Sequence, residues 1–195
     1  LKDRVLKVYK KSYPNIKFVI EDHRDFKNKK QIPKIEDVPL NGVTLRKHQV
    51  RAGNAMLKKK HGVLWASTNS GKTEVAIALI KALEEPALFL VKGKDLVLQT
   101  YERFKKRLGE EEIGIITSSK WDVRKFTVAS ADTLARRFNP NKVTKNSGDR
   151  KKQVEELLTR IKVVVIDECH TLASDGLFSI VRYCTAPYRY GLSGT

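Results

Sequence analysis

A short segment in the first half of the chain has the composition of a phosphate-binding loop. It runs from Ala66 to Thr73, follows the apolar run Val63–Ala66 and opens an Ala- and Leu-rich stretch, Thr73–Leu83. Small residues between a strand and a helix let backbone N–H groups surround a phosphate chain, and the helix N-terminus adds partial positive charge. We expect a nucleoside triphosphate to be held by Ala66, Ser67, Thr68, Asn69, Ser70, Gly71, Lys72 and Thr73.

Two side chains of this loop have chemical roles that their types predict. The Lys72 ammonium would neutralise the β- and γ-phosphates, and the Thr73 hydroxyl would bind Mg²⁺. One departure is visible, because Ala66 stands where such loops usually begin with glycine. Alanine is still small enough for the turn, so ATP with Mg²⁺ remains the expected ligand.

A second apolar run ends in acidic residues. Ile161–Ile166 leads directly into Asp167-Glu168-Cys169-His170. A parallel strand delivers the residues after its carboxyl end to the edge of the sheet where ligands bind. Asp167 could then hold Mg²⁺, Glu168 could orient and deprotonate the attacking water, and His170 could report the nucleotide state to other segments. The alternative is a solvent-exposed acidic turn.

The elements that must position these residues follow an alternating pattern. Short apolar runs are separated by stretches with helical features, such as the four-residue recurrence of Leu96, Thr100, Phe104 and Leu108. Uninterrupted apolar runs are typical of parallel strands covered on both faces. The expected strands are Val63–Ala66, Ala87–Val91, Ile113–Ile116, Phe126–Ala129 and Ile161–Ile166. We therefore predict an α/β lobe with a mainly parallel sheet and helices on both faces, including a helix over Val154–Thr159.

The first 40 residues differ from the rest. Helical spacing near the start, a strand-like run at Ile16–Ile20, a charged stretch and the Pro-containing linker Ile32–Pro39 predict a small N-terminal α/β appendage. We therefore divide the chain into an accessory segment with linker, 1–40, and a nucleotide-binding lobe, 41–195. The polar stretch Asn139–Lys152 is interpreted as a mobile solvated loop, with a loop that touches nucleic acid as the alternative.

Charge and composition restrict the classes of binding partner that the chain suits. The chain contains 39 Lys and Arg against 22 Asp and Glu, a net charge of +17, which suits a polyanion such as nucleic acid. A basic factor at a ribosome or a membrane surface is the alternative. Hydrophobic residues make up 41% of the chain, and no apolar run is long enough to cross a bilayer, so we expect a soluble protein without a membrane partner. Two cysteines, Cys169 and Cys184, indicate a reducing compartment.

Taken together, these segments resemble superfamily 2 helicases. Asp167-Glu168-Cys169-His170 looks like their DExH box, and Ala66–Thr73 looks like their motif I. Other matches follow in the family's order. They are Leu45–Gln49 (LRxxQ element), Leu90–Gln99 (motif Ia), Val128–Leu134 (motif Ib) and Gly191–Thr195 (motif III, with Gly194 as a departure). Spacing and the N-terminal appendage resemble the UvsW and XPB branch.

The resemblance implies an ATP-binding lobe of RecA type in a nucleic-acid-dependent ATPase. It implies that Gln49 recognises adenine and that motif III couples the site to movement through Ser193, Gly194 and Thr195. It also implies nucleic-acid contacts, more readily to DNA than to RNA, by Lys92, Lys94, Gln99, Thr133 and Arg136. A second RecA-like lobe would follow and supply an arginine, so we expect these 195 residues alone to hydrolyse ATP negligibly.

Several functions stay open at the level of sequence. The first is a helicase or a motor that remodels branched DNA; the second is a duplex translocase of the restriction or remodelling type. An RNA helicase and a non-catalytic ATP-sensing module complete the alternatives, although intact Lys72, Thr73, Asp167 and Glu168 favour catalysis. We expect a cytoplasmic protein in a prokaryote or a phage-infected cell, and a nuclear one in a eukaryote.

Overall fold

One twisted sheet organises the part of the chain that the computed structural model describes, residues 32–139, 146–173 and 175–194. Its strand order is β1-β7-β6-β2-β5-β3-β4, and every neighbouring pair is parallel except β3 and β4. The strands are β1 (His61–Trp65), β2 (Ala87–Val91), β3 (Ile113–Ile116), β4 (Trp121–Asp122), β5 (Phe126–Ser130), β6 (Val163–Ile166) and β7 (Tyr188–Ser193).

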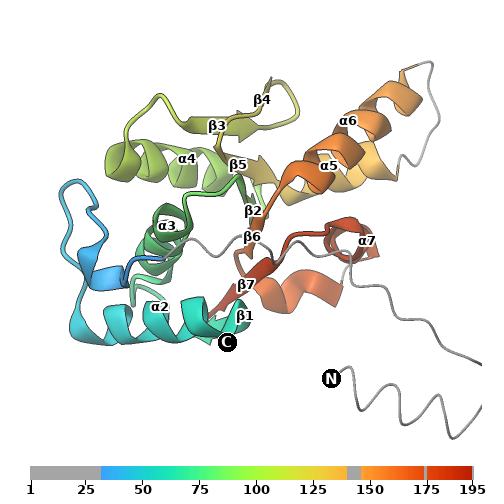
Figure 1. The fold of residues 1–195 in the computed structure, drawn as a ribbon. Helices are drawn as coiled ribbons and strands as arrows, with labels where there is room; N and C mark the ends of the chain where they lie inside the picture. Colours follow the sequence, from blue (N-terminus) through green and yellow to red (C-terminus); the bar gives the residue numbers. More distant parts are fainter. Residues whose placement is uncertain (1–31, 140–145, 174, 195) are drawn as a thin grey trace, which may run out of the picture.

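Helices cover both faces of this sheet (Figure 1). They are α2 (Lys47–Lys59), α3 (Lys72–Leu83), α4 (Lys94–Leu108), α5 (Ala131–Phe138), α6 (Ser147–Arg160) and α7 (Asp175–Tyr183), with short 3-10 turns η1 (Ile35–Asp37) and η2 (Cys169–Ala173). Core residues of α2, α3 and α4 join one hydrophobic cluster, and those of α5, α6 and α7 join another. The lobe is therefore a three-layer α/β structure, as the sequence predicted.

Alternation along the strands explains why both layers form. In β2, Ala87, Phe89 and Val91 belong to the first cluster, whereas Leu88 and Leu90 belong to the second. Successive side chains of a strand point to opposite faces, so an uninterrupted apolar run buries residues under both helix layers. All five residues of β2 are buried, which stabilises the centre of the sheet.

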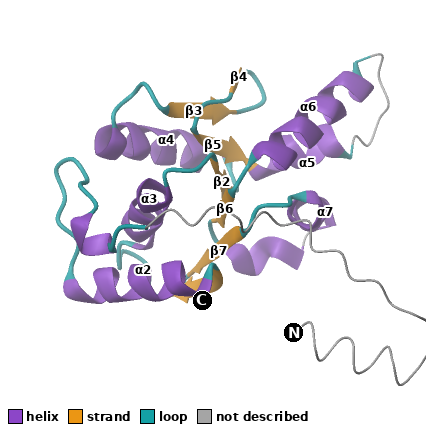
Figure 2. Cartoon of the chain, viewed as in Figure 1, coloured by secondary structure: helices purple, strands orange, loops and turns teal. Residues whose placement is uncertain are grey.

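The sheet order brings three chemically important segments together. Strands β1, β7 and β6 are neighbours at one side of the sheet and run in the same direction. Figure 2 shows β6 and β7 next to each other. Their carboxyl ends therefore lie side by side. The phosphate-binding segment follows β1, Asp167 follows β6, and Ser193 ends β7. Residues separated by about half of the sequence thus converge at one edge.

The structure corrects several expectations about the elements. All five expected strands occur within two residues of their predicted bounds. The largest differences are at two starts, because β1 begins at His61 and not at Val63, and β6 begins at Val163 and not at Ile161. The interpretation of 139–152 as a loop is wrong for 147–152, which form the first half of α6. Only the second half of that helix carries buried apolar residues, so the polar sequence of its first half resembles that of a loop. Residues 140–145 lie outside the described part of the chain.

Only part of the predicted N-terminal segment falls within the described residues. The expected helix and the strand Ile16–Ile20 lie outside the described residues. Within the expected linker, Ile35 is buried in the core of the lobe, and its nearest side-chain carbon is 2.8 Å from the position that a Cβ on Gly53 would occupy. The segment 32–40 therefore packs against α2, and the domain boundary at residue 40 stays a prediction. Among the described helices, none is long and apolar enough to cross a membrane.

Candidate nucleotide-binding site

The phosphate-binding segment forms a turn between β1 and α3. Asn69 and Gly71 adopt left-handed backbone conformations, with φ of 62° and 84°, and the Ser70 N–H donates to the Ser67 carbonyl at 3.2 Å. Gly71 precedes the first residue of α3, so the free N–H groups of that helix face the turn. Glycine adopts this conformation without strain, whereas other residues adopt it at a cost in free energy. The local backbone is thus shaped for an anion.

Lys72 lies across this turn. Its ammonium group donates to the Ala66 carbonyl at 2.8 Å and to the Ser67 carbonyl at 3.2 Å. Both partners are neutral carbonyl oxygens at the beginning of the loop. A phosphate is a stronger acceptor for an ammonium than a carbonyl is, so the lysine could exchange these bonds for phosphate oxygens without leaving the loop.

The two predicted acids lie beside the loop, at the carboxyl end of β6. The Asp167 N–H donates to the Leu90 carbonyl of the neighbouring strand at 2.9 Å, which fixes the turn. Glu168 has φ of 47°, and its N–H donates to the Asp167 carboxylate at 3.1 Å. Burial, followed by the negative charge of Glu168, raises the pKa of Asp167, while Lys72 and Arg103 oppose that rise. A cation beside Asp167 would offset the repulsion between the two carboxylates.

The end of β7 completes the site. The Gly194 N–H donates to the Glu168 carboxylate at 3.4 Å, and the His170 Nδ1 lies 3.2 Å from the Ser193 hydroxyl and 3.3 Å from the Glu168 carboxylate. Added to Gly194, a Cβ would lie 3.4 Å from the Lys72 nitrogen. The segment predicted to couple the site to movement therefore contacts both the acid pair and the loop. Thr195, also predicted there, lies outside the described residues.

Gln49 reaches the loop from the opposite side. It is 7% exposed; its side-chain N–H donates to the Ser70 carbonyl at 2.9 Å, and its side-chain oxygen accepts from the Arg46 N–H at 2.7 Å. The second bond caps the first turn of α2. The structure thus places Gln49 beside the phosphate loop, with its amide bonded to protein groups. Recognition of adenine by this residue stays a prediction.

A cavity of about 630 Å³ connects these groups. Thr68, Asn69, Lys72, Thr73, Asp167 and Glu168 are among the residues that line it. The helix α4 also lines it, through Glu102, Arg103, Lys106 and Arg107, for which no role was predicted. Cations on a helix are usually solvated, and only the packing of α4 beside α3 brings these to the phosphate loop.

Arg107 ties three parts of the site together. Its guanidinium donates twice to the Glu74 carboxylate, at 2.9 and 3.2 Å, and also donates to the carbonyls of Asn41 and Gly42 at 3.0 and 3.4 Å. Glu74 is in the first turn of α3, and Asn41 precedes the helix that carries Gln49. The Arg107 and Glu74 side chains are only 13% and 14% exposed. This bidentate pair therefore links the phosphate-loop helix to the segment before α2.

The residues present fit a magnesium ion that also binds phosphate. Thr73 and Asp167 both line the cavity and supply a hydroxyl and a carboxylate, which are oxygen ligands of the kind that Mg²⁺ prefers. Within the described ranges, no group of three or more His, Cys, Asp or Glu residues could hold a metal alone. Magnesium in such sites takes one or two protein ligands and completes its shell with water and phosphate oxygens.

The predicted nucleic-acid residues divide into exposed and buried. Lys92, Lys94, Gln99 and Arg136 are exposed. Thr133 is 5% exposed, and its N–H donates to the hydroxyl of Ser130, the N-cap of α5, at 3.2 Å. The prediction that Thr133 contacts nucleic acid at the surface is therefore corrected, because the residue is buried at the start of α5.

The fold and the site together define the class of the protein. The three-layer parallel sheet, the phosphate loop after an edge strand and the acid pair after β6 make this chain a RecA-like ATP-binding lobe of the superfamily 2 type. The chain belongs to the family described as "Type III restriction enzyme, res subunit", whose family model matches residues 42–195.

Comparisons with known proteins agree with this class. The chain is 30% identical over 193 residues to the DNA 3'-5' translocase XPB2 of Sulfurisphaera tokodaii, covering 95% of this chain and 40% of that protein. The fold is similar to that of the UvsW helicase from bacteriophage T4, with a TM-score of 0.64 and 17% identity over 98% of this chain and 70% of that one. It is also similar to the Sulfolobus solfataricus SWI2/SNF2 ATPase core solved with dsDNA, with a TM-score of 0.62 and 17% identity over 82% and 34% of the two chains. The chain thus spans less than half the length of the curated relative.

Proposed function

We propose that this chain is the ATP-binding lobe of a DNA-dependent ATPase that uses hydrolysis to move on DNA or to remodel it. One observation carries the proposal. The phosphate loop and the acid pair line one cavity, and Gly194, which follows β7, bonds to Glu168 and lies near Lys72. A site built only to hold ATP would need the loop, but it would not need a carboxylate and a coupling segment at the γ-phosphate end.

Each side chain has a separate task in the proposed reaction. The backbone N–H groups of the loop and Lys72 hold the β- and γ-phosphates, while Thr73 and Asp167 would hold Mg²⁺. When bound, the ion neutralises charge that develops on the phosphates. Glu168 accepts a proton from the attacking water and orients its oxygen toward the γ-phosphorus. His170 bridges Glu168 and Ser193, so a change at the γ-phosphate can reach β7.

The proposed polymer is DNA. Support comes from the net charge of +17, from the exposed cations Lys92 and Lys94 at the carboxyl end of β2, and from the 30% identity to a DNA translocase. We also propose that a second RecA-like lobe of the same protein closes over the ATP. Such a lobe would supply an arginine, which is worth about 10³–10⁵ in rate in other phosphate-loop enzymes. The protein would act in the cytoplasm, or in the nucleus of a eukaryote.

The test is the steady-state ATPase activity of the full-length protein with four stimulators. These are single-stranded DNA, duplex DNA, forked DNA and RNA, each at the same nucleotide concentration, with Lys72→Ala as the inactive control. We expect stimulation by DNA and little by RNA. Stimulation by RNA alone would replace the DNA motor with an RNA helicase, and no hydrolysis with any polymer would favour an ATP-sensing module.

A measurement of strand separation distinguishes the two kinds of DNA motor. A displacement assay on forked DNA and a triplex-displacement assay on duplex DNA use the same protein and the same ATP. Unwinding of the fork supports a helicase, whereas triplex displacement without unwinding supports a duplex translocase.

A further inference from the structure

The helices α5 and α6 carry a group of cations that the candidate nucleotide site does not use. α5 ends with Arg136 and Arg137, and the first half of α6 contains Arg150, Lys151 and Lys152. The two helices pack against each other, and α6 extends away from the strands in Figure 1. None of these residues lines the nucleotide cavity. We call Arg136, Arg137, Arg150 and Lys152 the α5–α6 surface.

Most of these cations have no carboxylate partner among the described residues. Arg136, Arg150 and Lys152 are exposed, and within the described ranges no acidic side chain lies within 4.0 Å of any of them. Lys151 differs because it pairs with Glu155 at 3.9 Å. A cluster of cations that is not neutralised by the protein's own acids presents a local positive field.

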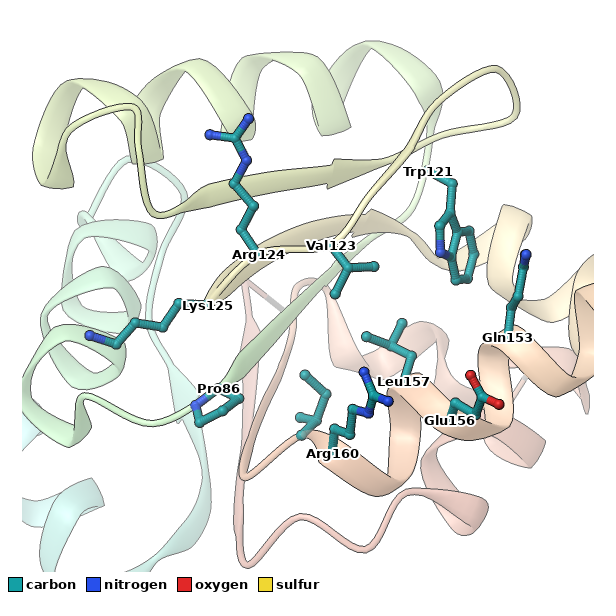
Figure 3. Close-up of a pocket in the computed structure, with 10 residues that line it drawn as sticks. Pro86, Trp121, Val123, Arg124, Lys125, Gln153, Glu156, Leu157 and Arg160 are labelled. Atoms are coloured by element: carbon teal, nitrogen blue, oxygen red, sulfur yellow. The ribbon is translucent and has the colours of Figure 1, made fainter.

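Arg137 is held in place at the centre of the α5–α6 surface. Its guanidinium carbon lies 4.5 Å from the centroid of the Trp121 ring, and its Nη1 donates to the Gln153 side-chain oxygen at 3.5 Å. Trp121 and Gln153 both line a hollow of about 370 Å³ under α6, and Figure 3 shows them side by side at one end of it. Stacking on an aromatic ring orients the planar guanidinium before any ligand arrives, which lowers the entropy lost on binding.

The position of Arg137 has an unfavourable electrostatic component that an anion would relieve. Burial, and then the positive charge of Arg150, lower the pKa of Arg137 from its usual value. Two guanidinium groups that repel each other without a nearby carboxylate are stabilised when a phosphate lies between them. The arrangement is therefore complementary to a polyanion and not to a neutral partner.

The sheet order relates the α5–α6 surface to the exposed cations at the proposed nucleic-acid side. Lys92 and Lys94 follow β2, and α5 begins directly after β5, which is the neighbour of β2 in the sheet. Arg136 is one helical turn beyond Thr133 on α5, a rise of about 5 Å. Exposed cations thus lie at the carboxyl end of β2, and others lie in the last turn of α5 and in the first half of α6.

We infer that the α5–α6 surface binds the phosphate backbone of DNA as a second contact, beyond the residues at the carboxyl ends of the strands. The inference rests on the proposed function. The contact is independent of base sequence, because its groups are cations suited to phosphates and not to base edges. Its role is to extend the footprint of the lobe along the DNA.

The experiment compares two triple variants of the chain that have the same net charge. Arg136, Arg150 and Lys152 are replaced with Ala in the first; Arg51, Lys58 and Lys59, exposed on α2 of the opposite layer, are replaced in the second. Each variant lowers the net charge from +17 by 3, to +14. Binding of a fluorescent duplex is followed by anisotropy at several salt concentrations. Each phosphate contact contributes about 0.9 to the slope of log affinity against log salt.

The α5–α6 variant should lose about two to three from that slope, and the α2 variant should keep nearly all of it. Equal losses in the two variants would overturn the inference, because only total charge would then matter. The single change Lys152→Glu serves as a second test on a minimal perturbation, and an unchanged slope there would also overturn it. Absence of duplex binding by the unsubstituted chain would instead refute the proposed function.

Discussion

The Arg107–Glu74 pair should be among the interactions that contribute most to the stability of the lobe. Both side chains are at most 14% exposed, and the guanidinium makes two bonds to the carboxylate and two to backbone carbonyls. Removing one partner of such a pair leaves a mostly buried, unpaired charge, which costs roughly 3–5 kcal/mol. Since the pair retains some contact with solvent, we expect about 3 kcal/mol for Arg107→Met.

The measurement is urea unfolding of the chain, followed by circular dichroism. In a domain of this size, about 3 kcal/mol corresponds to a melting temperature lower by roughly 6–12 °C. Glu74→Gln should cost less, about 1–2 kcal/mol, because the amide can still accept a hydrogen bond. A double-mutant cycle with both substitutions should show that the two effects are not additive, because each variant removes the same bonds.

Glu110→Gln is the matched control for this prediction. It removes the 2.8 Å ion pair between Lys105 of α4 and Glu110, which follows the end of that helix and whose side chain is 76% exposed. Solvent screens that pair, so the unfolding midpoint should not change. A loss below about 1 kcal/mol for Arg107→Met, or an additive cycle, would refute the reasoning that burial makes the Arg107 pair different.

Three further predictions concern the site. Gln49 presents donors and an acceptor that can pair with adenine, so the full-length enzyme should use ATP and dATP but GTP poorly. The Gln49→Ala variant should lose this preference, and equal turnover of GTP by the unsubstituted enzyme would exclude the assignment. Gly194→Ala should fold and bind nucleotide, because its Cβ would meet nothing nearer than 3.4 Å. In Gly191→Ala the Cβ would lie 2.7 Å from Cys169 Sγ, so this variant should lose about 1–3 kcal/mol in urea unfolding. Equal stabilities of the two variants would contradict the packing described. Burial raises the pKa of Asp167, so in the absence of Mg²⁺ the Asp167→Asn variant should have a higher free energy of unfolding than the unsubstituted chain at pH values above that raised pKa. This difference should vanish as the pH falls to the ordinary pKa range of an aspartate, and a difference that persists in acid would contradict the prediction.

The sequence predicted those parts of the fold that depend on local pattern. The buried runs at Ala87–Val91 and Ile113–Ile116 match β2 and β3 to the residue, because uninterrupted apolar segments have few alternatives in an α/β chain. By contrast, β7 mixes Tyr, Arg, Gly and Ser, so its strand character comes from pairing with β1 and β6. The helices α2, α5 and α7 were not predicted. In α2 the reason is that exposed polar and basic residues dominate the helix.

The site was predictable where residues are close in sequence and less so where the fold joins distant ones. Lys72, Asp167 and Glu168 meet at one cavity as expected. Arg103 and Arg107 carried no signal, because a lysine- and arginine-rich helix is usually solvated and only its packing beside α3 reveals the contact. The orientation of the Gln49 side chain was also not predictable, since its bonds to Ser70 and Arg46 depend on how α2 packs beside the loop.

The central claim is that this cavity hydrolyses ATP with Glu168 as the base. The most direct measurement compares nucleotide affinity and steady-state hydrolysis in the full-length protein and its Glu168→Gln variant, with saturating DNA. We predict that the variant binds ATP with an affinity similar to that of the unsubstituted protein and that hydrolysis falls by roughly 10²–10⁴. Normal turnover by Glu168→Gln would exclude Glu168 as the base, because the reaction would then need a group other than the carboxylate that Gly194 and His170 contact beside the loop.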